Sequence, residues 1–108
     1  MKKLYDEISN QTSVMITRKY STSFSLGIYY LDPNIREPIY SIYGFVRLAD
    51  EIVDSFHDYN KPELLKKFRE DTVLAIQQKI SLNPVLNSFQ SVYHKYHIDW
   101  DLVDVFLK

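Results

Sequence analysis

Two aspartates in the segment RLADEIVDSF have the types and spacing best suited to chemistry in this chain. Asp50 and Asp54 stand four residues apart, and Arg47 and Tyr43 precede them. In a helix, which turns about 100° per residue, these four side chains fall within about 60° of one another. Two parallel carboxylates can hold Mg²⁺ when water and substrate phosphates complete its shell. Arg47 would then bind phosphate or orient a carboxylate.

An ordinary solvated helix face with an Arg–Asp ion pair is the alternative interpretation of the same residues. Two carboxylates at this spacing repel by about 0.2–0.5 kcal/mol in water, and unpaired carboxylates in a dry core would cost several kcal/mol. Aliphatic residues about 90–100° around the helix form a second stripe that is expected to pack: Ile42, Val46, Ala49 and Val53. Spacing alone leaves both interpretations open.

Apolar spacing of three and four residues predicts five or six helices and no sheet. The expected helices cover residues 4–19, 23–31, 35 or 38–56, 62–80 and 84–97, with a sixth starting at residue 99. Proline and asparagine mark several boundaries, because Asn-Lys-Pro-Glu at 60–63 and Asn-Pro at 83–84 are helix-start signals. The first helix is expected to pack through Leu4, Ile8, Met15 and Ile16.

Composition excludes several classes of protein. The net charge is −1, from 13 Lys+Arg and 14 Asp+Glu, so nothing indicates nucleic-acid binding. Cysteine is absent, which excludes disulfide and thiolate chemistry. No signal peptide and no transmembrane segment is expected, and we predict a cytoplasmic location with peripheral membrane contact as the alternative. The 15% aromatic content indicates packing between helices or, alternatively, the lining of an apolar cavity.

The stretch YSTSFSLGIYYLDPNIREPIYSIYGFVRLADEIVD resembles the start of the squalene and phytoene synthase family, which are head-to-head isoprenyl diphosphate synthases. The family pattern has a Ser-rich stretch containing S-F, followed by a helix with Y-x-x-x-R-x-x-D-D/E-x-x-D. The matching residues are Ser21, Ser23, Phe24, Tyr43, Arg47, Asp50, Glu51 and Asp54. The resemblance is strong over residues 20–56, and beyond them only the helical rhythm continues. It implies an all-α fold, made of the N-terminal helices of an isoprenoid-synthase (terpenoid synthase) fold.

The resemblance implies that Asp50 and Asp54 form the first of two aspartate-rich motifs. They would bind Mg²⁺, with Mn²⁺ as a second candidate, and the metal would bridge to a prenyl diphosphate. It would neutralise the leaving diphosphate while an allylic cation develops.

The resemblance also implies roles for five further side chains. Arg47 and the hydroxyls of Ser21 and Ser23 would contact the diphosphate, while Phe24 and Tyr43 would flank the cation or the prenyl chain. Helix capping is the alternative for the two serines, and plain packing is the alternative for the two rings.

Family members are more than twice as long as this chain and carry a second aspartate-rich helix. Asp99, Asp101 and Asp104 have the wrong spacing for it and are expected to cap the last helix. Three histidines make no metal cluster and are expected at the surface: His57, His94 and His97. We therefore interpret residues 1–108 as the N-terminal part of a single domain, cut within its last helix. Alone, the chain is expected to be inactive and either to self-associate or to be poorly stable.

For the intact protein, the resemblance implies Mg²⁺-dependent condensation of two geranylgeranyl diphosphates to phytoene, a step of isoprenoid and carotenoid biosynthesis. Synthesis of squalene or dehydrosqualene from farnesyl diphosphate is the enzymatic alternative. A family-like binding or assembly protein without catalysis is the other, although such a protein has no need of two metal carboxylates.

Overall fold

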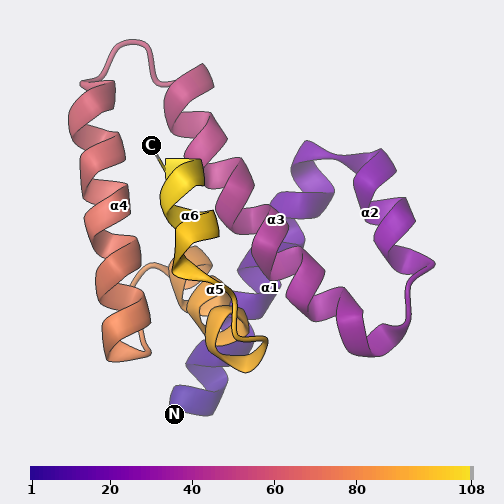
Figure 1. The fold of residues 1–108 in the computed structure, drawn as a ribbon. Helices are drawn as coiled ribbons and strands as arrows, with labels where there is room; N and C mark the ends of the chain where they lie inside the picture. Colours follow the sequence, from indigo (N-terminus) through magenta and orange to yellow (C-terminus); the bar gives the residue numbers. More distant parts are fainter. Residues whose placement is uncertain (108) are drawn as a thin grey trace.

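The computed structural model of the chain describes residues 1–107, and these form six α-helices without a strand (Figure 1). The helices are α1 (Lys2–Tyr20), α2 (Thr22–Tyr29), α3 (Pro33–Asp54), α4 (Lys61–Gln78), α5 (Pro84–Lys95) and α6 (Trp100–Leu107). The all-α prediction is confirmed. No helix within residues 1–107 combines the length and the apolar character needed to cross a bilayer.

Three helices begin with the same local device. A side-chain oxygen just before the helix accepts a hydrogen bond from an amide two or three residues later, and a proline follows near the first position, where its missing amide is not needed. The capping residues are Asp32, Asn60 and Asn83. The two asparagine caps were predicted from the sequence and are confirmed.

The helix boundaries differ from the sequence prediction in a regular way. Because Asp32 caps it, α3 already begins at Pro33, and Pro38 lies inside the helix rather than in its first turn. Helices α2 to α5 each end two residues before the expected position. Near two of these ends the backbone turns left-handed, at Lys79 (φ 59°) after α4 and at His97 (φ 54°) after α5.

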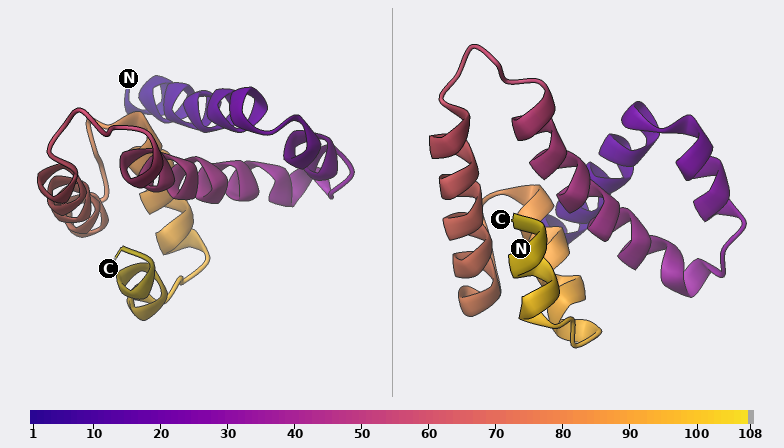
Figure 2. Two further views of the ribbon diagram at one scale, coloured as in Figure 1. Left: turned by 90° about the horizontal axis from the view of Figure 1, so that it is seen from above. Right: turned by 45° about the horizontal axis from the view of Figure 1, so that its top comes forward.

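Helices α1, α3 and α5 pack on one another at the centre of the fold. Helix α1 crosses α3, and α5 contacts both of them, while α4 packs against α3 and α5 (Figures 1 and 2). Helix α2 joins the end of α1 to the start of α3 on the side away from α4 and α6 (Figure 1). Both the end of α1 and the start of α2 contact α3, so residues 20–24 lie close to the helix that carries the two aspartates.

Helix α1 packs through small hydroxyl residues. Ser9, Ser13 and Thr17 follow one another at four-residue spacing and are each 0% exposed. The Ser9 hydroxyl donates to the Tyr5 carbonyl, and the Thr17 hydroxyl donates to the Ser13 carbonyl, at 2.9 Å in both cases. Because the hydroxyls of Ser9 and Thr17 are satisfied within their own helix, they can be buried without a large desolvation cost.

The sequence prediction of the packing face of α1 was therefore largely wrong. Leu4, Ile8 and Met15 are 49%, 47% and 54% exposed, and of the four predicted residues only Ile16 packs against the core. Large side chains on the inner face would hold α1 away from its neighbours, whereas serine and threonine permit a close approach.

The crossing of α1 and α3 depends on a glycine. A Cβ atom at Gly44 would lie 3.0 Å from Ser13 Oγ and 3.3 Å from Ser13 Cα. At the same place Ser13 Oγ donates to Ser88 Oγ (3.0 Å), which donates to Ser41 Oγ (2.5 Å). This buried chain of hydroxyls ties α1, α5 and α3 together.

Beside the hydroxyl chain lies an apolar core built around aromatic rings. Phe45 of α3 stacks on Phe89 of α5 with 4.0 Å between ring centroids, and on Phe68 of α4 with 5.4 Å. Helix α6 adds Val103 and Leu107 to the same cluster. These rings pack between helices, which was one of the two interpretations of the aromatic content.

Asn87 of α5 is a buried amide that forms hydrogen bonds to the N-terminal half of α1. Its Nδ2 donates to Asp6 Oδ1 (2.9 Å) and to Ser9 Oγ (3.0 Å), and its Oδ1 accepts from the Ser81 amide and from Gln90 Nε2, both at 3.3 Å. With 1% of its surface exposed, Asn87 joins α1, α5 and the α4–α5 connection. A buried amide with all these partners fixes the register of α1 against α5.

Replacing Gly44 by leucine should separate α1 from α3. We expect Gly44→Leu to lower the free energy of unfolding by about 1–3 kcal/mol, because the new side chain must displace the Ser13 backbone. Gly27→Leu is the matched control, since a Cβ at Gly27 meets nothing within 4 Å, and it should raise stability slightly by improving helix propensity. Urea unfolding measures both variants, and equal effects would contradict the close crossing.

We expect Asn87→Ala to lower the free energy of unfolding by about 2 kcal/mol or more, because several buried groups lose their hydrogen-bond partner at once. The control is Asn10→Ala, which removes a single exposed hydrogen bond to Glu37 and should cost less than about 1 kcal/mol. Thermal or urea unfolding of both variants checks this. If Asn87→Ala lowers the free energy of unfolding no more than the control does, the stabilising role of the Asn87 hydrogen bonds is wrong.

Candidate active site

Helix α3 carries Tyr43, Arg47, Asp50 and Asp54 along one side, which we call the polar stripe. At about 100° per residue this stripe lies opposite the buried side of the helix. The buried residues of α3 are Ser41, Gly44, Phe45, Ala49 and Ile52. Tyr43, Arg47 and Asp50 are partly buried and Asp54 is exposed, so the predicted grouping of the four side chains on one face agrees with the helix.

The packing side of α3 is displaced from the aliphatic stripe that the sequence indicated. Of that stripe Ala49 is buried, Ile42 and Val46 are partly buried, and Val53 is 52% exposed. Helix α3 instead approaches α1 closely at Gly44, and a search for aliphatic residues does not detect a glycine contact.

The serine-rich turn between α1 and α2 begins with a helix cap. Ser21 Oγ accepts a hydrogen bond from the Phe24 amide at 3.0 Å, so the capping interpretation of Ser21 is confirmed. Ser23 lies exposed in the first turn of α2. The amides of this turn make the start of α2 a place where negative charge is favoured.

Two aromatic contacts hold the serine turn beside the polar stripe. On one side of Ser21, the Tyr20 ring lies under the Arg47 guanidinium, with 4.7 Å from its centroid to Arg47 Cζ. On the other side, the Phe24 ring stacks on Tyr43, with 4.7 Å between centroids and 26° between planes. The structure thus brings together the two sequence motifs at residues 21–24 and 43–54.

Arg47 forms its ion pair with Glu51 and not with an aspartate. Arg47 Nη2 lies 2.7 Å from Glu51 Oε2, and the two side chains are 24% and 17% exposed. The Arg–Asp pair of the alternative interpretation is therefore wrong in its partner. The reason is geometric, because Glu51 follows Arg47 by four residues and its longer side chain reaches the guanidinium.

The pKa values around this pair shift as the contacts require. Hydrogen bonds from Ser55 and from Arg47 hold the pKa of the Glu51 carboxyl below its ordinary value. A hydrogen bond to Glu51 raises the pKa of the Tyr20 hydroxyl, and the bond to Glu51 also raises the pKa of the Arg47 guanidinium. Glu51 therefore stays ionised, and Arg47 and Tyr20 stay protonated, around neutral pH.

Asp50 and Asp54 differ from Glu51, because within residues 1–107 no hydrogen bond or ion pair reaches either carboxylate. Two unpaired carboxylates one helical turn apart fit a divalent cation bound through a few protein oxygens. They do not complete its shell, and no cluster of three metal-ligating side chains is found in the described part of the chain. The remaining ligands would have to be water, phosphate or further protein oxygens.

Asp99 and Asp104, near the last helix, have different structural roles. Asp99 Oδ1 accepts from the Asp101 amide at 2.9 Å, which confirms capping at the start of α6. Asp104 was expected to cap as well, but its carboxylate pairs with Arg69 of α4, whose guanidinium lies over the Trp100 ring. The correction follows from tertiary packing, since Arg69 comes from a helix 35 residues earlier in the chain.

The histidines are distributed as expected with one exception. His57 and His97 are exposed. His94 is only partly exposed, and its Nε2 lies 2.9 Å from the Ile76 carbonyl of α4. Its surface assignment was therefore wrong, because α4 packs over that side of α5.

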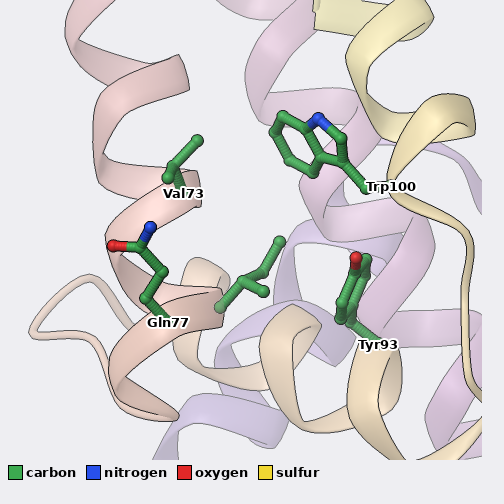
Figure 3. A pocket seen from close by; sticks show the side chains of 5 residues that line it. Val73, Gln77, Tyr93 and Trp100 are labelled. Atoms are coloured by element: carbon green, nitrogen blue, oxygen red, sulfur yellow. The ribbon is translucent and has the colours of Figure 1, made fainter.

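An apolar cleft of about 350 Å³ opens between α4, α5 and α6, lined by Val73, Ile76, Gln77, Tyr93 and Trp100 (Figure 3). The Tyr93 and Trp100 rings form one wall, and Val73 and Gln77 face them from α4 (Figure 3). None of the predicted site residues lines this cleft. It is separate from the polar stripe.

Two residues of the candidate site were missed in the sequence. Tyr20 gives no signal of its own, since only the fold places it on Arg47. Glu51 was noted as part of the acidic motif but received no role, although the four-residue spacing from Arg47 is a signal for an ion pair.

A comparison with protein-family models gives one match. The squalene/phytoene synthase model matches residues 17–108, a stretch that includes the serine turn and the whole polar stripe. No curated protein and no solved structure matches the chain. With well over half of its residues matched, the chain belongs to the squalene/phytoene synthase family.

Proposed function

We propose that this chain is the N-terminal part of a prenyltransferase that joins two molecules of geranylgeranyl diphosphate head to head to give phytoene. Family membership supports the general class of squalene/phytoene synthase-like prenyltransferase. The observation that carries the proposal is the meeting of two unpaired carboxylates, an arginine and a helix start on one side of α3. A diphosphate with a divalent cation is the ligand that this combination suits.

In this proposal Asp50 and Asp54 supply carboxylate oxygens to Mg²⁺, with Mn²⁺ as the second candidate. Their unpaired state supports this assignment, because they need not break an ion pair to receive the cation. When bound, the metal would neutralise charge on the leaving diphosphate. The cost of placing two like charges one turn apart is offset by the cation.

Arg47 and the serine turn hold the diphosphate in this proposal. The Arg47 side chain remains 24% exposed, and its guanidinium lies against the ring of Tyr20, which directly precedes Ser21. The Ser21 oxygen accepts from the Phe24 amide, which leaves its own hydrogen to donate to a phosphate oxygen. Ser23 and the first amides of α2 add donors and a favourable helix dipole on the same side.

The stacked pair of Phe24 and Tyr43 forms a wall beside the diphosphate site. Phe24 is 43% exposed, so part of its ring remains available to a ligand. Ring faces attract positive charge, and the pair could flank the allylic cation or the start of the prenyl chain. Packing and substrate contact are compatible here, because the stack uses one face of each ring.

We also propose that residues 1–108 are part of a larger single domain with a cytoplasmic location. Support for the larger domain comes from large apolar side chains on the outer sides of α1 and α6. Leu4, Ile8 and Met15 of α1 are about half exposed, and Leu102 and Val105 of α6 are 70% and 73% exposed. Soluble proteins rarely leave such surfaces bare, so further chain or a second copy is expected to cover them.

Neutralising either aspartate of the stripe should abolish product formation by the intact protein. We expect Asp50→Asn and Asp54→Asn each to lower turnover by about 100-fold or more, with helical content unchanged by circular dichroism, because metal and transition-state charge are lost together. Asp58→Asn, in the exposed turn after α3, is the control. Unchanged turnover in the stripe variants would reject the metal assignment.

Chelation of divalent cations should stop the reaction, and added Mg²⁺ should restore it.

Product analysis after incubation with geranylgeranyl diphosphate or with farnesyl diphosphate then identifies the substrate. The proposal expects phytoene from the longer substrate. Squalene or dehydrosqualene as the main product would replace the proposed specificity, and activity that survives chelation would contradict the metal requirement.

A further inference from the structure

Arg47 is held from two directions by side chains for which the sequence predicts no role of their own in the site. The Glu51 carboxylate pairs with Nη2 at 2.7 Å, and the Tyr20 ring lies against the guanidinium at 4.7 Å. Glu51 comes from the next turn of α3, and Tyr20 is the last residue of α1. An arginine side chain is long and loses much freedom when fixed, so two contacts of this kind define its position.

The acidic residues of α3 fall into two groups by what they contact. Glu51 is 17% exposed and is engaged by Arg47 and, through hydrogen bonds that lower its pKa, by Ser55 and Tyr20. Asp50 and Asp54 have no such partner within residues 1–107. Glu51 also lies about 100° around the helix from Asp50, on the side of Tyr20. Its carboxylate is occupied, whereas theirs are open to a cation.

Stability alone does not explain the arrangement. Within residues 1–107, Arg47 Nε is buried and has no hydrogen-bond partner. A buried donor without a partner costs free energy, and in a native structure it calls for an explanation such as strain at a functional site. The cost is present while the guanidinium stays against the ring of Tyr20, the residue directly before Ser21.

We propose that Glu51 and Tyr20 are positioning residues that hold the Arg47 guanidinium toward the diphosphate, and that Glu51 is not a metal ligand. This inference rests on the proposed function. It divides the acidic motif into a metal pair, Asp50 and Asp54, and an arginine-orienting residue, Glu51. It also gives the last residue of α1 a role in the site, through its ring against the guanidinium.

Binding of inorganic diphosphate to the intact protein at saturating Mg²⁺ tests the inference by calorimetry. Glu51→Gln should weaken diphosphate binding by about 10-fold and leave the Mg²⁺ concentration for half-maximal binding unchanged, because orienting partners typically contribute a factor of about 10–100. Tyr20→Phe keeps the ring, so its diphosphate affinity should stay within about 3-fold of that of the wild type. Tyr20→Leu removes the ring and should weaken diphosphate binding nearly as much as Glu51→Gln does. The exposed Glu70→Gln on α4 is the matched charge control.

A double-mutant cycle separates positioning from a general structural effect. In an Arg47→Gln background, Glu51→Gln should have no further effect on diphosphate affinity, because its action passes through Arg47. Additive losses, or a raised Mg²⁺ requirement in Glu51→Gln, would overturn the inference. If Glu51→Gln does not fold, Tyr20→Leu, at a half-exposed position, gives the same test.

The outcomes also separate this inference from the proposed function. In one outcome, Asp50→Asn weakens diphosphate binding, but Glu51→Gln and Tyr20→Leu do not. That result would overturn the positioning role and keep the proposed function. Absence of any Mg²⁺-dependent diphosphate binding by the intact protein would overturn both.

Discussion

The close crossing of α1 and α3 at Ser13 and Gly44 is the contact on which the arrangement of this molecule depends. It requires small side chains on both helices, and it is sealed by the hydroxyl chain from Ser13 through Ser88 to Ser41. Because α1 runs on from this point for only two more turns, the crossing decides where the end of α1 lies. Tyr20 and the serine turn arrive over Arg47 as a consequence.

Helix α3 separates its two tasks by face. Its inner face packs on α1, α4 and α5 through residues such as Phe45, whose ring stacks on two neighbours. Its outer face carries the polar stripe, where charge is tolerated because solvent or a ligand can reach it. Within that face the acidic residues differ again, since Glu51 is bound to Arg47 while Asp50 and Asp54 have no partner within residues 1–107.

Features that depend on local chemistry could be predicted from the sequence. Asn60 and Asn83 predicted helix starts correctly, because an asparagine cap and a following proline act within one helical turn. The grouping of the polar stripe on one face could be predicted from the helical period alone. The resemblance through the two linked motifs agrees with the family match over residues 17–108.

Features that depend on tertiary contacts were missed. The inner face of α1 consists of Ser9, Ser13 and Thr17, which a search for apolar periodicity passes over. The partner of Asp104 comes from another helix, and so does the ring that covers Arg47. The Arg47–Glu51 ion pair could have been predicted from its four-residue spacing. However, Asp50 and Asp54 are also close to Arg47 in sequence, so the sequence alone did not identify the partner.

A crystal structure of the intact protein with Mg²⁺ and inorganic diphosphate would test the site most directly. We predict that carboxylate oxygens of Asp50 and Asp54 contact the metal, that Arg47 contacts the diphosphate, and that Glu51 still pairs with Arg47 under the Tyr20 ring. A metal bound by Glu51, or a diphosphate bound away from α3 and the serine turn, would contradict the division of roles described for this helix.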